Sequence, residues 1–338
     1  MGAGVQMKNK KVLITGGCGF LGHHMIEHFL KNTNWDICVM DGISYAGDLN
    51  RMKDIGVFDD KRVKFVWHDL RSLVPDTLAV HISDVNYIVH LAAETHVGNS
   101  IVDPLPFIHS NVLGFGNLLD WAKTLKELDK LLLFSTDEVF GPAPMDYAFN
   151  EEDRLKPGNP YAATKAAQEM LAGAYINTYK MPILISRCMN LFGERQHPEK
   201  FIPLILRKII QGEQIELHGT GPDDSALRCW THCRTASDAV LRILERGYVG
   251  VKYHIVGHEF SVSEIFRKIK IIYGRLTLAP QYVPFEKARP GHDPRYALED
   301  NNLIGLDWSW AEHDFDTELK KTIEWMMDEK NKKWLKLL

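Results

Sequence analysis

The chain has 338 residues, of which 45% are hydrophobic, 10% aromatic and 25% charged, and these proportions are typical of a globular protein with a sizeable core. Its 40 Lys and Arg residues against 44 Asp and Glu residues give a net charge of −4. The sequence contains no basic block that could follow a phosphate backbone, which argues against nucleic acid as a partner. No apolar run approaches the roughly 20 residues that span a bilayer, no signal-peptide pattern is present, and the 5 scattered cysteines indicate reduced thiols, so we expect a cytoplasmic protein with no membrane partner.

Up to residue 190, short apolar runs alternate with longer amphipathic stretches. The apolar runs predict buried strands at 11–15, 37–40, 63–67, 87–91, 131–135 and 182–186. Helical patterns lie between them, at 21–30, 103–125 and 161–179. Strands that are apolar throughout and separated by helices indicate a parallel sheet covered on both faces. The fold class is therefore predicted as α/β, with a doubly wound parallel sheet.

Beyond residue 190 Gly and Pro become frequent, and strands are predicted only as brief pieces such as 215–217. A helical pattern returns at 237–245, and a strand-like run follows at 253–256. Two further amphipathic helices are predicted near 263–273 and 315–330. These patterns predict that the C-terminal part of the chain forms a smaller α/β lobe.

A glycine-rich segment, Gly16-Gly17-Cys18-Gly19-Phe20-Leu21-Gly22, follows the first predicted strand and opens the first predicted helix. Glycines in this context let the backbone approach a pyrophosphate, which the helix N-terminus favours through its unpaired N–H groups. Asp41 ends the next strand, about 20 residues on, where its carboxylate would accept ribose hydroxyls. Because Gly42 follows and supplies no cation for a 2′-phosphate, the pattern predicts NAD rather than NADP.

Two further motifs carry candidate catalytic groups. Ser135-Thr136-Asp137-Glu138 follows the fifth strand, at the sheet edge where such folds bind ligands. Tyr161 and Lys165 lie at i and i+4 of a predicted helix and so share one face. A neighbouring ammonium would lower the pKa of the phenol and let Tyr161 act as a base, with Thr136 bonded to the same substrate oxygen.

These motifs resemble those of the extended short-chain dehydrogenase/reductases that act on nucleotide sugars, in particular the dTDP-glucose 4,6-dehydratases. The resemblance extends from Lys11 to about Trp325. It rests on the segments 15–22, 41–47, 92–96, 135–141, 161–165, 198–203 and 289–296.

The resemblance implies an NAD-dependent lyase that converts an NDP-hexose to its 4-keto-6-deoxy product through tightly bound NAD, with C4 oxidation, loss of water across C5–C6 and return of the hydride to C6. In that reaction Tyr161 would remove the C4 hydroxyl proton, Glu138 would take the C5 proton, and Asp137 would protonate the leaving hydroxyl. The acidic doublet is the most specific feature, because two adjacent carboxyl groups in different environments can serve as base and acid.

The resemblance also implies the site residues and the organisation of the chain. Those for NAD are Gly16, Gly19, Phe20, Leu21, Gly22, Asp41, Ser44, Gly47, Asp69, Leu70, Leu91, Ala92, Ala93, Ser135, Tyr161 and Lys165. Those for a dTDP- or UDP-hexose are Thr95, Thr136, Asn190, Arg228, Arg289 and His292. We expect a Rossmann NAD-binding domain at 7–186, completed by about 235–257, and a nucleotide-sugar-binding lobe at 187–234 and 258–338. A homodimer through the helices at 103–125 and 161–179 is implied as well.

Some residues depart from the family pattern and leave the nucleotide base and the sugar open. Gly98 and Asn99 replace the usual Asp and Arg, and the segments 229–234 and 257–259 also differ. The pair Cys229 and Cys233, with His232 between them, has no second ligand pair, so we predict no metal.

Other outcomes on the same fold stay open at this point. The same catalytic groups could give a 5,6-unsaturated sugar or dehydrate an N-acetylhexosamine. In a 4-epimerase or a decarboxylase, Asp137 would have no task. A catalytically silent NAD-binding scaffold is disfavoured because Thr136, Tyr161 and Lys165 are all present.

Overall fold

The computed structural model describes residues 9–288 and 294–337. Its centre is a seven-stranded sheet in the order β11-β6-β5-β4-β1-β2-β3, and each neighbouring pair is parallel. The strands are β1 (Lys11–Thr15), β2 (Asp36–Asp41), β3 (Val63–Trp67), β4 (Tyr87–His90), β5 (Lys130–Thr136), β6 (Ile183–Cys188) and β11 (Lys252–Ile255). The prediction of a doubly wound parallel α/β sheet is confirmed.

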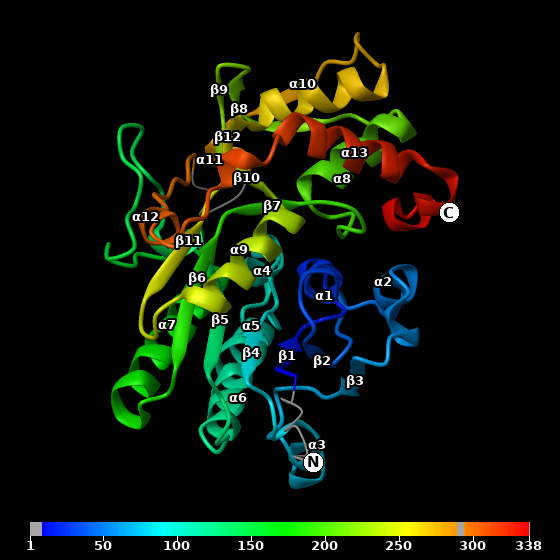
Figure 1. Cartoon of the computed structure of the whole chain (residues 1–338). Coiled ribbons are helices and arrows are strands. Elements are labelled where there is room, and N and C mark those ends of the chain that lie inside the picture. The colour runs from blue at the N-terminus through cyan, green and yellow to red at the C-terminus, as the bar shows by residue number, and fades with distance from the viewer. Residues whose placement is uncertain (1–8, 289–293, 338) are drawn as a thin grey trace.

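Helices cover both faces of this sheet (Figure 1). Val12 and Ile14 of β1 belong to one apolar cluster, with α1 and α9, whereas Leu13 belongs to a second cluster, with α6 and α7. This alternation explains why each central strand is apolar at every position. The helices of these layers are α1 (Phe20–Asn32), α2 (Leu49–Asp54), α3 (Asp76–Ile82), α4 (Val97–Val102), α5 (Leu105–Phe107), α6 (Gly114–Ala122), α7 (Pro160–Tyr179) and α9 (Cys233–Arg246).

Two predicted elements differ in detail. The strand at 63–67 was expected to be buried, but β3 is the edge of the sheet, and Trp67 is 65% exposed. The helix expected over 103–125 is interrupted, because Asp103 before Pro104 leaves the helical region at φ −142°, as residues before proline tend to do. A π-helical turn, Ile108–Leu113, then joins α5 to α6.

Most of the remaining elements build a third apolar core, around Leu206, Ile265 and Leu319, whereas Leu303 packs in the cluster of α1 and α9. They lie together at the top of Figure 1, with two three-stranded sheets in the orders β12-β10-β7 and β13-β8-β9. The strands are β7 (Asn190–Phe192), β8 (Glu216–Gly221), β9 (Asp224–Ser225), β10 (Leu227–His232), β12 (His258–Ser261) and β13 (Gln281–Val283). The helices are α8 (Phe201–Gln211), α10 (Val262–Tyr273), α11 (Phe285–Ala288), α12 (Asn301–Ile304) and α13 (Phe315–Met327), and short 3₁₀ turns include η3 (Asp137–Phe140) and η5 (Glu329–Leu335).

Between β10 and β12 in the sequence, the chain returns to the large sheet, because β11 (Lys252–Ile255) pairs with β6. The domain boundaries near 186, 235 and 257 stay a prediction. Within the residues described, the model contains no helix with the length and apolar character needed to cross a membrane.

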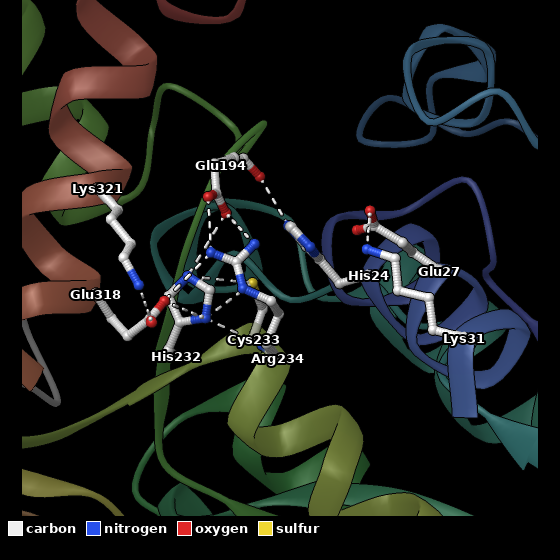
Figure 2. Close-up of polar contacts among 9 residues, drawn as sticks. All are labelled: His24, Glu27, Lys31, Glu194, His232, Cys233, Arg234, Glu318 and Lys321. Carbon is white, nitrogen blue, oxygen red and sulfur yellow. Dashed lines mark hydrogen bonds and ion pairs between the residues drawn. The ribbon is translucent and has the colours of Figure 1, made fainter. Parts of the chain in front are cut away.

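A buried polar network ties α1 to the second group of elements (Figure 2). The Arg234 guanidinium forms two hydrogen bonds of 2.8 and 3.1 Å with the Glu194 carboxylate and also pairs with Glu318 on α13 at 3.2 Å. The His24 ring on α1 bonds the Glu194 carbonyl oxygen at 2.9 Å. The network therefore joins segments that are far apart in sequence.

Candidate active site

A cleft opens at the carboxyl ends of β1, β4 and β5, where ligands bind in sheets of this kind. It consists of two adjoining pockets that share Gly16, Gly19, Leu91 and Ala93. All sixteen residues predicted for the dinucleotide line these pockets: Gly16, Gly19, Phe20, Leu21, Gly22, Asp41, Ser44, Gly47, Asp69, Leu70, Leu91, Ala92, Ala93, Ser135, Tyr161 and Lys165. The model therefore brings this set together.

The glycine loop packs closely against its own backbone and against the segment that follows β4, which leaves no room for a Cβ. Gly16 has φ +73°, and a Cβ there would lie 2.7 Å from the Ala92 amide nitrogen. A Cβ on Gly22 would lie 2.4 Å from the Gly16 carbonyl oxygen. Gly19 precedes α1 without a side-chain cap, so the first amides of the helix have no side-chain acceptor. Such a helix N-terminus attracts an anion.

Asp41 lies at the end of β2 and also organises this loop. Its carboxylate accepts hydrogen bonds from the Cys18 amide at 2.9 Å and the Ile43 amide at 2.7 Å. Burial raises the pKa of Asp41, and these two amides oppose the shift. Each oxygen keeps a further lone pair, which can accept a ribose hydroxyl.

The residues at the end of β5 form a compact acidic site. Thr136 caps the 3₁₀ turn η3, accepting from the Glu138 amide at 3.3 Å and donating to Asp137 Oδ1 at 2.9 Å. Asp137 Oδ2 is buried and has no hydrogen-bond partner among the described residues. Burial, with help from the Glu138 charge, raises the pKa of Asp137 to about 7. Near neutral pH this side chain can therefore hold a proton to donate.

The Glu138 carboxylate is held by a hydrogen bond from a residue at the start of α7. The Asn159 amide donates to Glu138 Oε2 at 2.9 Å, and Asn159 Oδ1 accepts from the Ala162 amide as the N-cap of the helix. One side chain thus positions both the acidic doublet and the helix that carries Tyr161. Sequence reasoning missed Asn159, although an Asn before Pro160 is a recognisable helix-start signal.

Tyr161 and Lys165 line the cleft, but their electrostatics differ from the expectation. Burial raises the pKa of Tyr161, the charges of Glu138 and Asp137 raise it further, and a hydrogen bond from Thr136 opposes them. Lys165 Nζ donates to the Phe134 carbonyl at 2.7 Å, and burial lowers its pKa to about 7. In the chain by itself the pKa of Tyr161 is therefore raised, because burial and two carboxylates disfavour the phenolate, and the effect of Lys165 on this pKa stays a prediction.

A second layer of polar groups supports α7 and was not found from sequence. Asn111, in the π-helical turn, bonds the Glu94 backbone at 2.8 and 3.0 Å and the Thr164 hydroxyl at 2.9 Å. Glu169 accepts from Ser135 Oγ at 2.6 Å and forms an ion pair with Arg187 at 2.8 Å, with both charged side chains only 2% exposed. No sequence signal links these residues, since they meet only in the fold.

Only some of the residues predicted to bind the sugar nucleotide line the cleft. Thr95, Thr136 and Asn190 line the cleft. Arg228 lies on β10 outside the lining, where it bonds the Leu227 and Pro294 carbonyls and stacks on Tyr296. Its charge still acts on Asp137, whose pKa it lowers. The predicted residues Arg289 and His292 lie outside the described residues.

The cysteine-histidine segment on β10 takes part in a different grouping from the one considered in the sequence. His24, Glu194 and Cys233 offer ligand atoms within 4.8 Å of one another. Arg234 already pairs with both Glu194 oxygens, so a dication there would lie beside a guanidinium. Burial also raises the pKa of the Cys233 thiol, which disfavours the thiolate that binds metal.

Comparisons with known proteins agree with this geometry. The family model described as GDP-mannose 4,6 dehydratase matches residues 13–312. The chain is 36% identical over 319 residues to the low-salt glycan biosynthesis protein Agl12 of Haloferax volcanii, covering 94% of this chain and 98% of that protein. It is 34% identical over 323 residues to the dTDP-glucose 4,6-dehydratase of Mycolicibacterium smegmatis, covering 93% and 92%. The crystal structure of DesIV, a dTDP-glucose 4,6-dehydratase from Streptomyces venezuelae with NAD and TYD bound, matches with a TM-score of 0.86 and 31% identity over 95% and 98% of the two chains.

Proposed function

The chain belongs to the nucleotide-sugar 4,6-dehydratases of the extended short-chain dehydrogenase/reductase family, and from that premise we propose that it converts a dTDP- or UDP-hexose to the 4-keto-6-deoxy product. It is an NAD-dependent nucleotide-sugar 4,6-dehydratase. The observation that carries the assignment of roles is the acidic doublet beside Tyr161, in which Asp137 keeps an unpartnered, buried carboxyl oxygen.

NAD fits the cleft, since the N-terminus of α1 has no side-chain cap and can offer its amides to a diphosphate, and Asp41 offers its oxygens to a ribose. When bound, NAD supplies a reversible hydride acceptor, so that C4 can be oxidised and C6 later reduced within one turnover. The chain holds it through the loop at Gly16–Gly22, the segment around Asp41–Gly47 and the strand end at Leu91–Ala93. We propose residues 7–186, completed by about 235–257, as the unit that binds it, and 187–234 with 258–338 as the unit that binds the sugar nucleotide.

Tyr161 and Thr136 act on the C4 hydroxyl of the hexose. Both side chains line the cleft, so one substrate oxygen can contact both. Tyr161 takes the C4 proton, and the Lys165 ammonium stabilises the phenolate that results. The chain alone raises the pKa of Tyr161, and the positive charge of an oxidised nicotinamide bound in the cleft would oppose that shift.

Glu138 and Asp137 divide the loss of water between them. The 4-keto group acidifies the proton on C5, and Glu138, held by Asn159, removes it. Asp137 donates its proton to the hydroxyl leaving C6, and its pKa near 7 keeps that proton available. Glu138 then returns a proton to C5. Tyr161 then releases the C4 proton to solvent and Asp137 regains a proton from solvent, so that both groups are ready for the next turnover and water is the only species lost.

We propose that Thr95 and Asn190 contact the sugar diphosphate from the cleft wall, with Arg228, Arg289 and His292 around the phosphates or the base. We also propose a cytoplasmic homodimer. Its support is a set of exposed apolar side chains along α4 to α7, namely Val102 (87%), Leu105 (59%), Ile108 (44%), Leu113 (49%) and Met170 (62%).

The function is tested by incubating the chain separately with dTDP-glucose, UDP-glucose and UDP-N-acetylglucosamine, with and without added NAD. We expect mass spectrometry to show a product lighter by one water from one of them, without net reduction of NAD. NMR then separates a 4-keto-6-deoxy product from a 5,6-unsaturated one. An unchanged mass with all three substrates would contradict the proposal, and a new epimer of unchanged mass would replace it with 4-epimerisation.

A further inference from the structure

An arginine that no sequence motif singled out lies at the glycine loop. Arg51, in the short helix α2, is 2% exposed and lines the same cleft as Gly16 and Gly19. Its guanidinium is fixed by three backbone carbonyls: Nε bonds Arg195 O at 3.1 Å, and one terminal nitrogen bonds Cys18 O at 3.0 Å and Ala46 O at 2.6 Å. The guanidinium therefore links the glycine loop to the turn after Asp41.

The charge of Arg51 has no carboxylate counterpart in the part of the chain that is described. No described Asp or Glu forms an ion pair with it, and the second terminal nitrogen makes no hydrogen bond to a described residue. Asp48 and Asp41 favour the charged form only at longer range, and burial lowers the pKa of Arg51. A buried guanidinium that bonds only carbonyls has room for an anion, because its planar fork carries five N–H donors.

The position of this cation indicates which anion it meets. Arg51 bonds the carbonyl of Cys18, one residue before Gly19 and the uncapped N-terminus of α1. The residues of that helix end and Arg51 both line the cleft, so an anion between them would be bound from two sides. We propose that Arg51 donates to a phosphate oxygen of the bound dinucleotide, adding a cation to the backbone amides at the start of α1.

The C-terminal segment holds this side chain in place. The Trp334 ring lies 5.2 Å from the Arg51 guanidinium carbon. Trp334 Nε1 in turn donates to Asp54 Oδ2 at 3.0 Å, at the end of α2. A tryptophan ring over one face of a guanidinium restricts its orientation and leaves its edge free to donate. Trp334 is thus a positioning residue for Arg51, and the segment Glu329–Leu335 supports the dinucleotide site from outside it.

The test compares a ligand that has the diphosphate with one that lacks it. The full-length chain, with its bound nucleotide measured beforehand, is titrated calorimetrically with ADP-ribose and with adenosine. Arg51→Met, which keeps the aliphatic stem against Trp334, should weaken ADP-ribose binding by about 10- to 100-fold and change adenosine binding by less than about two-fold. Arg51→Lys should fall between the wild type and Arg51→Met, because it keeps the charge but not the fork.

The matched control is Lys53→Met, on the same helix, which removes the same charge from an exposed position and should leave both affinities unchanged. Arg51→Gln replaces Arg51→Met if the latter does not fold. Unchanged ADP-ribose binding in the Arg51 variants, or equal weakening of ADP-ribose and adenosine, would overturn the inference. The inference rests on the dinucleotide site proposed above. If the wild type binds neither ligand, both the proposed dinucleotide site and the inference about Arg51 are wrong. If the wild type binds the ligands and only the Arg51 variants depart from the expected result, the role of Arg51 alone is wrong.

Discussion

At the scale of single residues, the two carboxyl groups that follow β5 are distinguished by their surroundings. Asp137 is wholly buried with one oxygen unpartnered, whereas Glu138 receives a hydrogen bond from Asn159. The doublet could be recognised in the sequence, because adjacent acids after a strand end are a local pattern, whereas its two roles were implied by the family resemblance and stay a proposal. The electrostatics of Tyr161 could not, since they depend on burial and on carboxylates that only the fold brings close.

The pKa of Asp137 predicts how the loss of water depends on pH. Because burial raises it to about 7 from the ordinary 3.8, the proton to be donated is present below that pH and is lost as pH rises through it. The rate of water loss should therefore decline above about pH 7. In Asp137→Asn that step should be slow at every pH, by about 100-fold or more at pH 6, while C4 oxidation survives.

This prediction is measured by rapid mixing, with reduced cofactor followed by absorbance and product by mass spectrometry. The exposed Asp146→Asn serves as the control and should keep the wild-type profile. Equal slowing of oxidation and water loss in Asp137→Asn would argue against the acid role.

Removing the phenol should stop the reaction at its first step. Tyr161→Phe deletes only the hydroxyl that takes the C4 proton, and we expect turnover to fall by about 100- to 10,000-fold. The melting temperature and the amount of bound NAD should stay close to the wild type. Unchanged turnover of a true substrate in this variant would contradict the mechanism.

At the scale of elements, the active site depends on how β5, α7 and β6 are held together. Ser135 on β5 and Arg187 on β6 both bond Glu169 on α7. The sequence predicted these three elements closely, because apolar runs and helical periodicity are local signals. It could not predict the Glu169–Arg187 pair or the π-helical turn at Ile108–Leu113, which are set by partners distant in sequence.

The Glu169–Arg187 pair predicts a large effect on stability. Glu169→Ala leaves a buried guanidinium unpaired and removes the acceptor of Ser135 Oγ, so the free energy of unfolding should drop by about 3–5 kcal/mol. Replacing both Glu169 and Arg187 by Met should cost less than the single change, because no charge is left buried alone. Urea unfolding of the two variants measures the difference. A double variant less stable than Glu169→Ala would contradict this account.

At the scale of the whole molecule, the parallel sheet was predictable and the second group of elements was only partly so. The helices α10 and α13 follow from their amphipathic patterns, and β11 was recognised as a strand. The strands β7, β10 and β12 pair residues as far apart as Asn190 with Trp230 and Leu227 with Ser261. Short strands with such distant partners carry little local signal.

The proposed homodimer makes a prediction at this scale. Leu105→Glu combined with Met170→Glu places charges on the two exposed apolar helix faces, and light scattering should then report a monomer. Leu276→Glu, at a site that is 65% exposed outside those helices, should leave the dimer intact. A wild-type chain that is already monomeric, or a double variant that stays dimeric, would contradict the interface.

The central claim is that one cleft removes a hydrogen from C4 and returns it to C6 while water is lost between them. The most direct measurement uses dTDP-glucose carrying deuterium at C4, with the product analysed by mass spectrometry and NMR. We predict a product lighter by one water that retains the deuterium, now on C6, without net reduction of NAD. A dehydrated product without deuterium at C6, or a product that keeps all its oxygen, would contradict the account.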